Sequence, residues 1–289
     1  VGAILFIASR PSEPASAPDA AAQRALLRDG ALSGAQAIVI ARAMAATAFD
    51  APGAPSGEEA SPARAAFTDA ATVLVQDPDP AVRAAIDQAA QPATRGDGIE
   101  TVWRLAEARS AAAPALMRAA AALFTLTADE RAEAALTRAL TRNPEDADLW
   151  RMLALAHARE GAGAEAQGAG LIAQALEAAR RDDRGGAGAL FKQALGLAKR
   201  AQTRAFLAGR LGDYAAQVHD YRAASAHYRE ALALHRQRDD VAAMAVEANK
   251  LARALAMLGQ AGSACAVLRD AETAGAAITP SAKASVCGS

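Results

Sequence analysis

Apolar residues recur along most of this chain at the spacing of one helix face, in segments of about 12 to 15 residues separated by short turns. In the segment 99–110, for example, Val102, Leu105 and Ala106 fall on a single face. No alternating run of valine, isoleucine and threonine is long enough to predict a sheet. Because short turns between consecutive helices produce antiparallel hairpins, the pattern predicts an all-α fold built from helical hairpins.

Helix-start signals divide the chain from residue 63 onward. Asp79 offers an N-cap with Pro80 at the first helical position, which predicts a helix through Ala90. Pro114 opens another helix, which we expect to end near Leu126. Two further helices are predicted at 63–75 and 99–110. The capping box Thr127-x-x-Glu130 predicts the start of a helix that runs to Arg142. The cap-plus-proline pair Asn143-Pro144 predicts the start of the helix that carries Trp150.

The predicted helix pairs recur as a unit, most clearly between Leu116 and Ala271. Successive units are spaced by 34, 58 and 40 residues, and the longest spacing leaves room for one extra helix at 185–201. A unit that recurs in this way cannot bury its apolar face alone and must stack on its neighbours, which predicts a solenoid. The landmarks are small residues expected where helices cross (Ala154, Gly212, Ala224 and Ala252) and large residues expected to fill the adjoining holes (Trp150, Tyr228 and Leu268).

These units resemble the tetratricopeptide repeat family. The residues that carry the resemblance in the unit 113–146 are Ala132, Leu136, Ala139, Leu140 and Pro144, and the next unit supplies Trp150, Leu153, Ala154 and His157. For residues 113–275 the resemblance implies a right-handed superhelical solenoid of helical hairpins. For residues 63–112 it leaves two alternatives, degenerate repeats or a helical cap. The 58-residue spacing departs from the family pattern.

In this family the first helix of each hairpin lines a concave groove that binds a partner protein or peptide. The resemblance therefore implies that groove residues contact a peptide, and that arginine and asparagine there hold an acidic or carboxylate-ended segment through charge-assisted hydrogen bonds. The family's carboxylate-clamp set is not reproduced, and a solvated polar face is the alternative for each residue. The implied partner-binding residues are Asp148, Arg151, Leu155, Arg159, Phe206, Gly209, Asp213, Asn249 and Arg253.

Composition agrees with close helix packing, because alanine occupies about three positions in ten and is the best helix former. The 31 basic and 32 acidic residues are interspersed, and no stripe of basic residues with interleaved aromatics appears, so we expect no nucleic-acid partner.

The two cysteines cannot form a disulfide framework, and no cluster of cysteine and histidine indicates a zinc site. Cys265 is expected in the core and Cys287 in a flexible tail at 276–289.

The ends of the chain add a membrane hypothesis. Residues 1–20 combine an apolar leader with a proline-rich linker, and the leader is too short to cross a bilayer by itself. It is either the end of a truncated membrane anchor, the apolar part of a signal peptide, or a frayed or buried leader. Residues 21–62 read as a helical segment followed by a disordered linker rich in proline and glycine. The localisation is accordingly either membrane-anchored with a soluble helical domain, or cytoplasmic.

No catalytic, cofactor or metal site is expected. His157 occupies the aromatic position of its repeat, so packing is its expected role, and His219, His227 and His235 are eight residues apart and do not converge. The sequence therefore favours a non-catalytic scaffold for a protein or peptide partner. The alternative is a regulatory or sensor part of a larger membrane-anchored signalling protein or enzyme. A third hypothesis, an enzyme with its own site in these helices, has less support.

Overall fold

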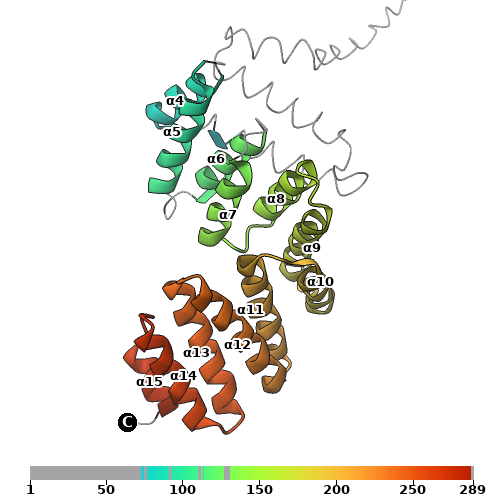
Figure 1. The fold of residues 1–289 in the computed structure, drawn as a ribbon, viewed down its shortest axis with the longest axis vertical. Helices are drawn as coiled ribbons and strands as arrows, with labels where there is room; N and C mark the ends of the chain where they lie inside the picture. Colours follow the sequence, from blue (N-terminus) through green and yellow to red (C-terminus); the bar gives the residue numbers. More distant parts are fainter. Residues whose placement is uncertain are drawn as a thin grey trace, which may run out of the picture.

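The computed structural model describes residues 73–74, 77–90, 93–109, 112, 114–126 and 131–287. These residues form helices joined by short turns and contain no strand, so the all-α prediction is confirmed for the described part of the chain (Figure 1). The helices are α4 (Pro80–Ala90), α5 (Arg95–Ala108), α6 (Pro114–Leu126), α7 (Ala132–Arg142), α8 (Ala147–Arg159), α9 (Gly163–Arg180), α10 (Arg184–Leu197), α11 (Ala201–Gln217), α12 (Tyr221–Gln237), α13 (Val241–Met257), α14 (Ala261–Thr273) and α15 (Pro280–Cys287).

The sequence signals locate several helix ends correctly. Helix α4 begins at Pro80, and the carboxylate of Asp79 accepts a hydrogen bond from the N–H of Ala81 at 2.8 Å. One cap was assigned wrongly: Asn143 ends α7, whereas Asp146 caps α8 by accepting the N–H groups of Asp148 and Leu149 at 3.0 and 3.3 Å. The carboxylate satisfies two N–H groups that the helix itself leaves free, and Asn143 lies too early to reach them. The capping box at 127–130 and most of the helix at 63–75 lie outside the described residues.

One type of turn recurs along the chain. Every residue with positive φ in the described part stands just past a helix end, and the next residue donates its N–H to a carbonyl five positions back, as in a Schellman motif. Three of these turns continue directly into an aspartate that caps the next helix, namely Asp183, Asp220 and Asp240. The positive-φ residues are Gly161, Asp182, His219, Asp239, Gly259 and Gly275.

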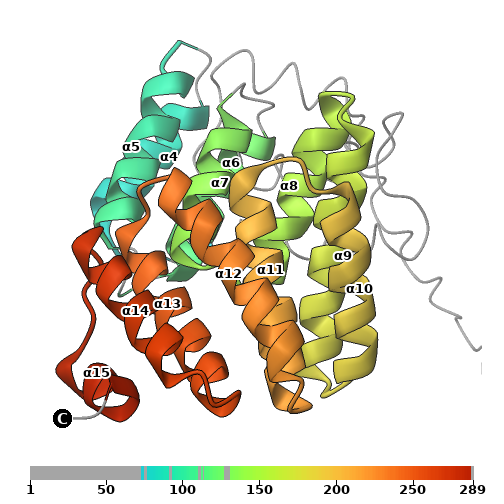
Figure 2. The same ribbon diagram turned by 60° about the horizontal axis from the view of Figure 1, so that its bottom comes forward.

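Each helix packs mainly against the helices that precede and follow it in the sequence. The pairs α6–α8 and α13–α15 also pack together and skip one helix, and side chains of α11 reach α7 and α8. In Figure 1 the helices succeed one another from α4 and α5 at the top to α15 at the bottom. In Figure 1 the path bends, from α4 and α5 at the upper left through α9 and α10 at the right to α15 at the lower left, and Figure 2 shows the same helices with α11 to α15 turned toward the viewer. The buried apolar residues accordingly form two clusters, one between Leu74 and Leu207 and one between Ala224 and Ile278.

The packing residues expected from the repeat are buried. Trp150, Tyr228 and Leu268 lie in the interior, as do the small residues Ala154, Ala224 and Ala252. The crossing at Gly212 is close, because a Cβ atom there would lie 2.5 Å from the ring of Tyr228. Helices α11 and α12 can therefore approach this closely only while residue 212 has no side chain.

The extra helix predicted at 185–201 is present as α10. Its largest buried side chain is Phe191, which had not been singled out, and it contacts the rings of Phe206 and Tyr214 at centroid distances of 6.1 and 6.0 Å. Helix α10 is therefore integrated into the first apolar cluster, between the helices of the second and third units.

The C-terminal segment differs from the flexible tail that the sequence suggested. Residues 280–287 form α15, and Cys287 is disulfide-bonded to Cys265 of α14, with 5.0 Å between the Cα atoms. Lys283 adds an ion pair to Glu272 at 2.5 Å. The two cysteines lie 22 residues apart in the sequence. Their spacing alone does not predict the disulfide, because the turn after α14 is what brings the two residues together.

The calls on residues 1–20 and 21–62, including the membrane anchor and the linkers, lie outside the described residues. Within the described part, none of the helices combines the length and apolar character needed to cross a bilayer.

We predict that Gly212→Ala destabilises the protein by about 1–3 kcal/mol, because the added methyl group overpacks the Tyr228 ring. Gly188→Ala is the matched control, since a Cβ atom at Gly188 in α10 meets nothing within 4 Å. That change should be neutral or stabilising by up to about 1 kcal/mol, as alanine is the better helix former. Urea unfolding of the two variants measures the difference, and equal stabilities would contradict the close crossing of α11 and α12.

We also predict that reduction of the Cys265–Cys287 bond releases α15, which has no buried residue of its own. In the chain-entropy treatment, closing a segment of this length contributes about 3 kcal/mol. Hydrogen exchange of residues 280–287 should become much faster in Cys287→Ser than in the oxidised wild type, while α11 and α12 keep their protection. Unchanged exchange in α15 would mean that the bond does not hold this helix.

Candidate functional site

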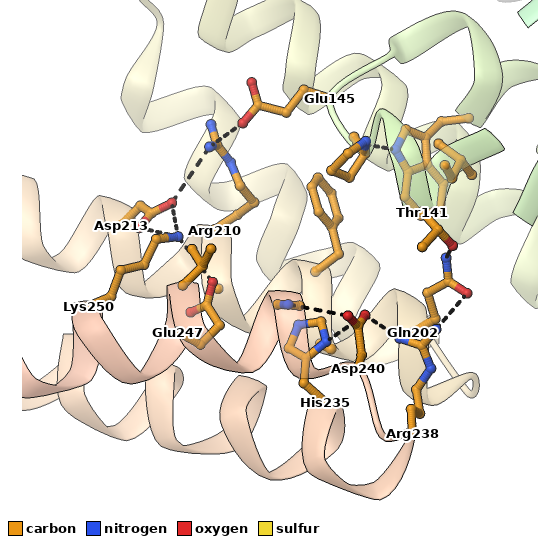
Figure 3. Close-up of a pocket in the computed structure, with 18 residues that line it drawn as sticks. Thr141, Glu145, Gln202, Arg210, Asp213, His235, Arg238, Asp240, Glu247 and Lys250 are labelled. Atoms are coloured by element: carbon orange, nitrogen blue, oxygen red, sulfur yellow. Dashed lines mark hydrogen bonds and ion pairs between the residues drawn. The ribbon is translucent and has the colours of Figure 1, made fainter. Parts of the chain in front are cut away.

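A cleft of about 270 Å³ opens between the turn that joins α7 to α8, one face of α11, the end of α12 and the first half of α13. It brings together three parts of the chain that are far apart in sequence (Figure 3). The lining residues are Leu140, Thr141, Pro144, Glu145, Trp150, Gln202, Ala205, Phe206, Gly209, Arg210, Asp213, His235, Arg238, Asp240, Ala243, Val246, Glu247 and Lys250.

One wall of the cleft is aromatic and apolar. Trp150 and Phe206 stack with ring centroids 5.4 Å apart and an interplanar angle of 29°. The indole N–H of Trp150 donates to the carbonyl of Pro144 at 2.8 Å, which fixes the ring while leaving it apolar toward the cleft. Val246 of α13 also lines the cleft and keeps 52% of its surface exposed. This wall can bury an apolar side chain of a ligand.

A network of paired charges lies along a second side. Arg210 binds Glu145 at 2.8 Å, and Lys250 binds both Asp213 and Glu247 at 3.1 Å. The hydroxyl of Tyr228 donates to Asp213 at 3.0 Å, so this carboxylate joins α11, α12 and α13. Because each cation of the network is paired with at least one carboxylate, the network positions the three helices and offers no free positive charge to a ligand.

The third side is a chain of hydrogen bonds across the mouth of the cleft. Gln202 donates to the hydroxyl of Thr141 at 2.9 Å and accepts from Arg238 at 3.2 Å. Asp240 lies 3.8 Å from the guanidinium of Arg238 and 3.4 Å from the imidazole of His235. This chain connects the end of α7 with the turn between α12 and α13 (Figure 3).

Three buried polar atoms around the cleft have no hydrogen-bond partner: Nε of Arg210, Oε2 of Glu247 and Nδ1 of His235. The carboxylate of Asp240 lies 3.4 Å from Nδ1 of His235, which is longer than the usual hydrogen-bond distance. Burial raises the pKa of Glu247, with Lys250 opposing the shift, and burial lowers the pKa of His235 against the opposing charge of Asp240. Unpaired polar groups of this kind mark where a polar ligand atom would be favourable.

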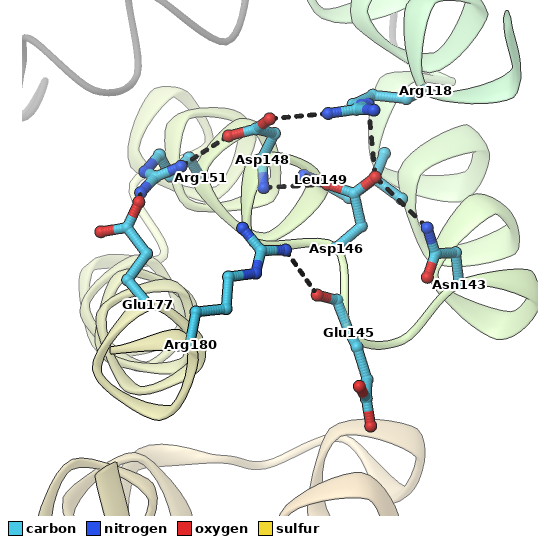
Figure 4. A network of polar contacts seen from close by, with 9 residues as sticks. All are labelled: Arg118, Asn143, Glu145, Asp146, Asp148, Leu149, Arg151, Glu177 and Arg180. Atoms are coloured by element: carbon cyan, nitrogen blue, oxygen red, sulfur yellow. Dashed lines mark hydrogen bonds and ion pairs between the residues drawn. The ribbon is translucent and has the colours of Figure 1, made fainter. Parts of the chain in front are cut away.

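Only some of the partner-binding residues that the family resemblance implied line this cleft. Phe206, Gly209 and Asp213 line it, as the family resemblance implied. Asp148 and Arg151 instead belong to a separate ion-pair network that joins α6, α8 and α9 (Figure 4). There Arg118 binds Asp148 at 2.7 Å, and Arg151 binds both Asp148 and Glu177. Arg151 is only 11% exposed, so it is committed to these partners.

The remaining implied residues do not line the cleft. Leu155 is wrong as a groove residue, because it lies in the core where α8 is covered by the helices around it. Asn249 uses its amide group to donate to the carbonyl of Ala245 on its own helix at 2.8 Å. Arg159 and Arg253 are exposed at other places on α8 and α13.

Sequence reasoning missed most of the polar residues of the cleft, including Glu145, Gln202, Arg210, Glu247 and Lys250. One signal is present in the sequence: Arg210 and Asp213 are three residues apart, which is the spacing of an ion pair on one helix face. This spacing does not indicate that the α7–α8 turn closes the cleft, because that contact joins residues 65 positions apart.

We predict that the protein loses stability as the pH falls from 7 to 5, in part through His235. Its folded-state pKa lies below the ordinary value of 6.5, so the unfolded chain binds a proton more readily, and unfolding becomes easier as the pH drops below that value. His235→Gln cannot take up this proton and should show a smaller loss of unfolding free energy over the same interval. Urea unfolding at both pH values measures the two slopes, and identical slopes would mean that His235 titrates normally in the folded protein.

No protein-family model matches this chain, and no curated protein is similar enough in sequence to count as a match. The function is therefore inferred from the geometry of the cleft and from the repeat pattern of the sequence.

Proposed function

We propose that this chain is a non-catalytic interaction module of the tetratricopeptide type, which binds an extended segment of a partner protein in the cleft between α8, α11 and α13. The observation that carries the proposal is the cleft itself, which joins an aromatic wall to a rim of fixed polar groups. Sites that bind peptides combine these two features, an apolar surface for side chains and polar groups that set orientation.

The arrangement of the helices supports the repeat part of the proposal. Consecutive helices pack on one another in chain order, and similar Schellman turns followed by a cap join several of them. The bent path seen in Figure 1 is of the kind expected of a superhelical solenoid of hairpins. The right-handed superhelix and the family membership are parts of this proposal.

The charges of the cleft favour an occupant that is itself nearly neutral. Arg210 and Lys250 are paired with carboxylates, so an acidic peptide would have to displace Glu145 or Asp213. The same holds outside the cleft for Arg151, which was expected to hold a peptide carboxylate but is paired with Asp148 and Glu177. An apolar side chain against Trp150, Phe206 and Val246, with backbone amides at the polar rim, fits the cleft best.

No observation favours the alternative of a regulatory part of a larger membrane-anchored protein, because it rests on residues outside the described part.

The test is selection of binding peptides from a phage-displayed library with the full chain, followed by titration of the selected peptides. Val246→Lys should weaken their binding at least about tenfold, because it removes apolar contact area and adds a charge beside Lys250. Val218→Lys is the matched control: Val218 is 73% exposed, ends α11 and does not line the cleft, so binding should stay within about twofold. Failure to select any peptide, or equal binding by both variants, would contradict the proposal.

A further inference from the structure

His157 carries a buried nitrogen that the fold leaves without a partner. The side chain lies in the last turn of α8 and is 2% exposed, and its Nδ1 atom makes no hydrogen bond. Packing explains why an aromatic ring occupies this position, as the repeat pattern expected. Packing does not explain why the ring presents a bare nitrogen to two carboxylates.

Those carboxylates are Glu133 in the first turn of α7 and Glu160 at the end of α8. Oε2 of each lies 3.9 Å from Nδ1 of His157, and the three atoms lie within 4.8 Å of one another. A separation of 3.9 Å is too long for a hydrogen bond. Three ligands that share one tetrahedral zinc ion at bond lengths of about 2.0–2.2 Å lie about 3.3–3.6 Å from one another. The three side chains therefore have to move closer together to share an ion.

Three carboxylates, those of Glu133, Glu160 and Glu165, face two cations around the imidazole, so the charge that remains is negative. Burial lowers the pKa of His157 although Glu160 and Glu165 oppose the shift, so the imidazole is neutral near pH 7 and able to act as a ligand. Arg200 pairs with Oε1 of Glu133, which leaves Oε2 turned to the imidazole, and Lys199 lies 3.8 Å from Glu165. The C-terminal end of α8 adds its partial negative charge.

We propose that His157, Glu133 and Glu160 bind a divalent transition-metal ion of the zinc type, with water completing the coordination. One imidazole with two carboxylates suits zinc better than magnesium or calcium, which prefer oxygen ligands throughout. The ion would tie the start of α7 to the end of α8. No sequence motif indicates this site, because its ligands come from two helices and lack the spacing of a metal-binding motif. The site is independent of the proposed peptide binding.

The test is calorimetric titration of the metal-free full chain with zinc chloride, together with cobalt(II) absorption as a report on coordination by nitrogen. Wild type should bind one equivalent at this site, and zinc should raise its melting temperature. Glu160→Gln should weaken that binding at least about tenfold and abolish the rise in melting temperature. Its side chain is 47% exposed, so the variant is expected to fold, which circular dichroism checks.

Two controls separate this site from adventitious binding. Glu165→Gln removes a nearby carboxylate that is not a ligand, and His227→Asn removes a histidine elsewhere; both should bind zinc as wild type does. Absence of a stoichiometric zinc site in wild type would overturn the proposal. Equal binding by wild type and Glu160→Gln, or loss of binding in His227→Asn alone, would overturn it as well.

Discussion

The close approach of helices at alanine and glycine is the constraint on which the rest of this structure depends. Small residues such as Ala224, Ala252 and Gly212 bring the backbones together, and a few large side chains, among them Tyr228 and Trp150, fill the spaces beside them. An alanine buries little apolar area, so no single hairpin gains much from folding alone. Stability therefore has to come from the contact of each helix with its neighbours, which is the packing order observed.

The same packing order creates the cleft. Since α10 is inserted between the second and third hairpins, α11 is placed across from the α7–α8 turn, and the stack of α13 on α12 supplies the opposite wall. The ion pair between Arg210 and Glu145 and the hydrogen bonds of Gln202 hold these parts together across long stretches of sequence. The candidate site is thus a product of the offset between hairpins, and no single hairpin contains it.

Because the cleft depends on how separate hairpins pack, the sequence predicts the fold better than it predicts the site. Prolines and caps fixed the starts of α4 and α6, and the repeat spacing correctly identified the buried residues Tyr228 and Leu268 and the extra helix α10. These features depend on local chemistry or on a period of the chain. The site was predicted less well, since Leu155 lies in the core and Arg151 is held in ion pairs. Which face of α8 stays open depends on how α6, α7 and α9 cover it, and a single repeat pattern does not contain that information.

We infer that neighbouring hairpins stabilise one another in series and do not share one common core. Native-state hydrogen exchange in increasing urea is the decisive measurement, because it resolves parts of a structure that open separately. Amides of the cluster between Ala224 and Ile278, which has fewer buried residues, should exchange at lower urea concentrations than those of α8 to α10. Exchange of all protected amides in one step at a single urea concentration would contradict it.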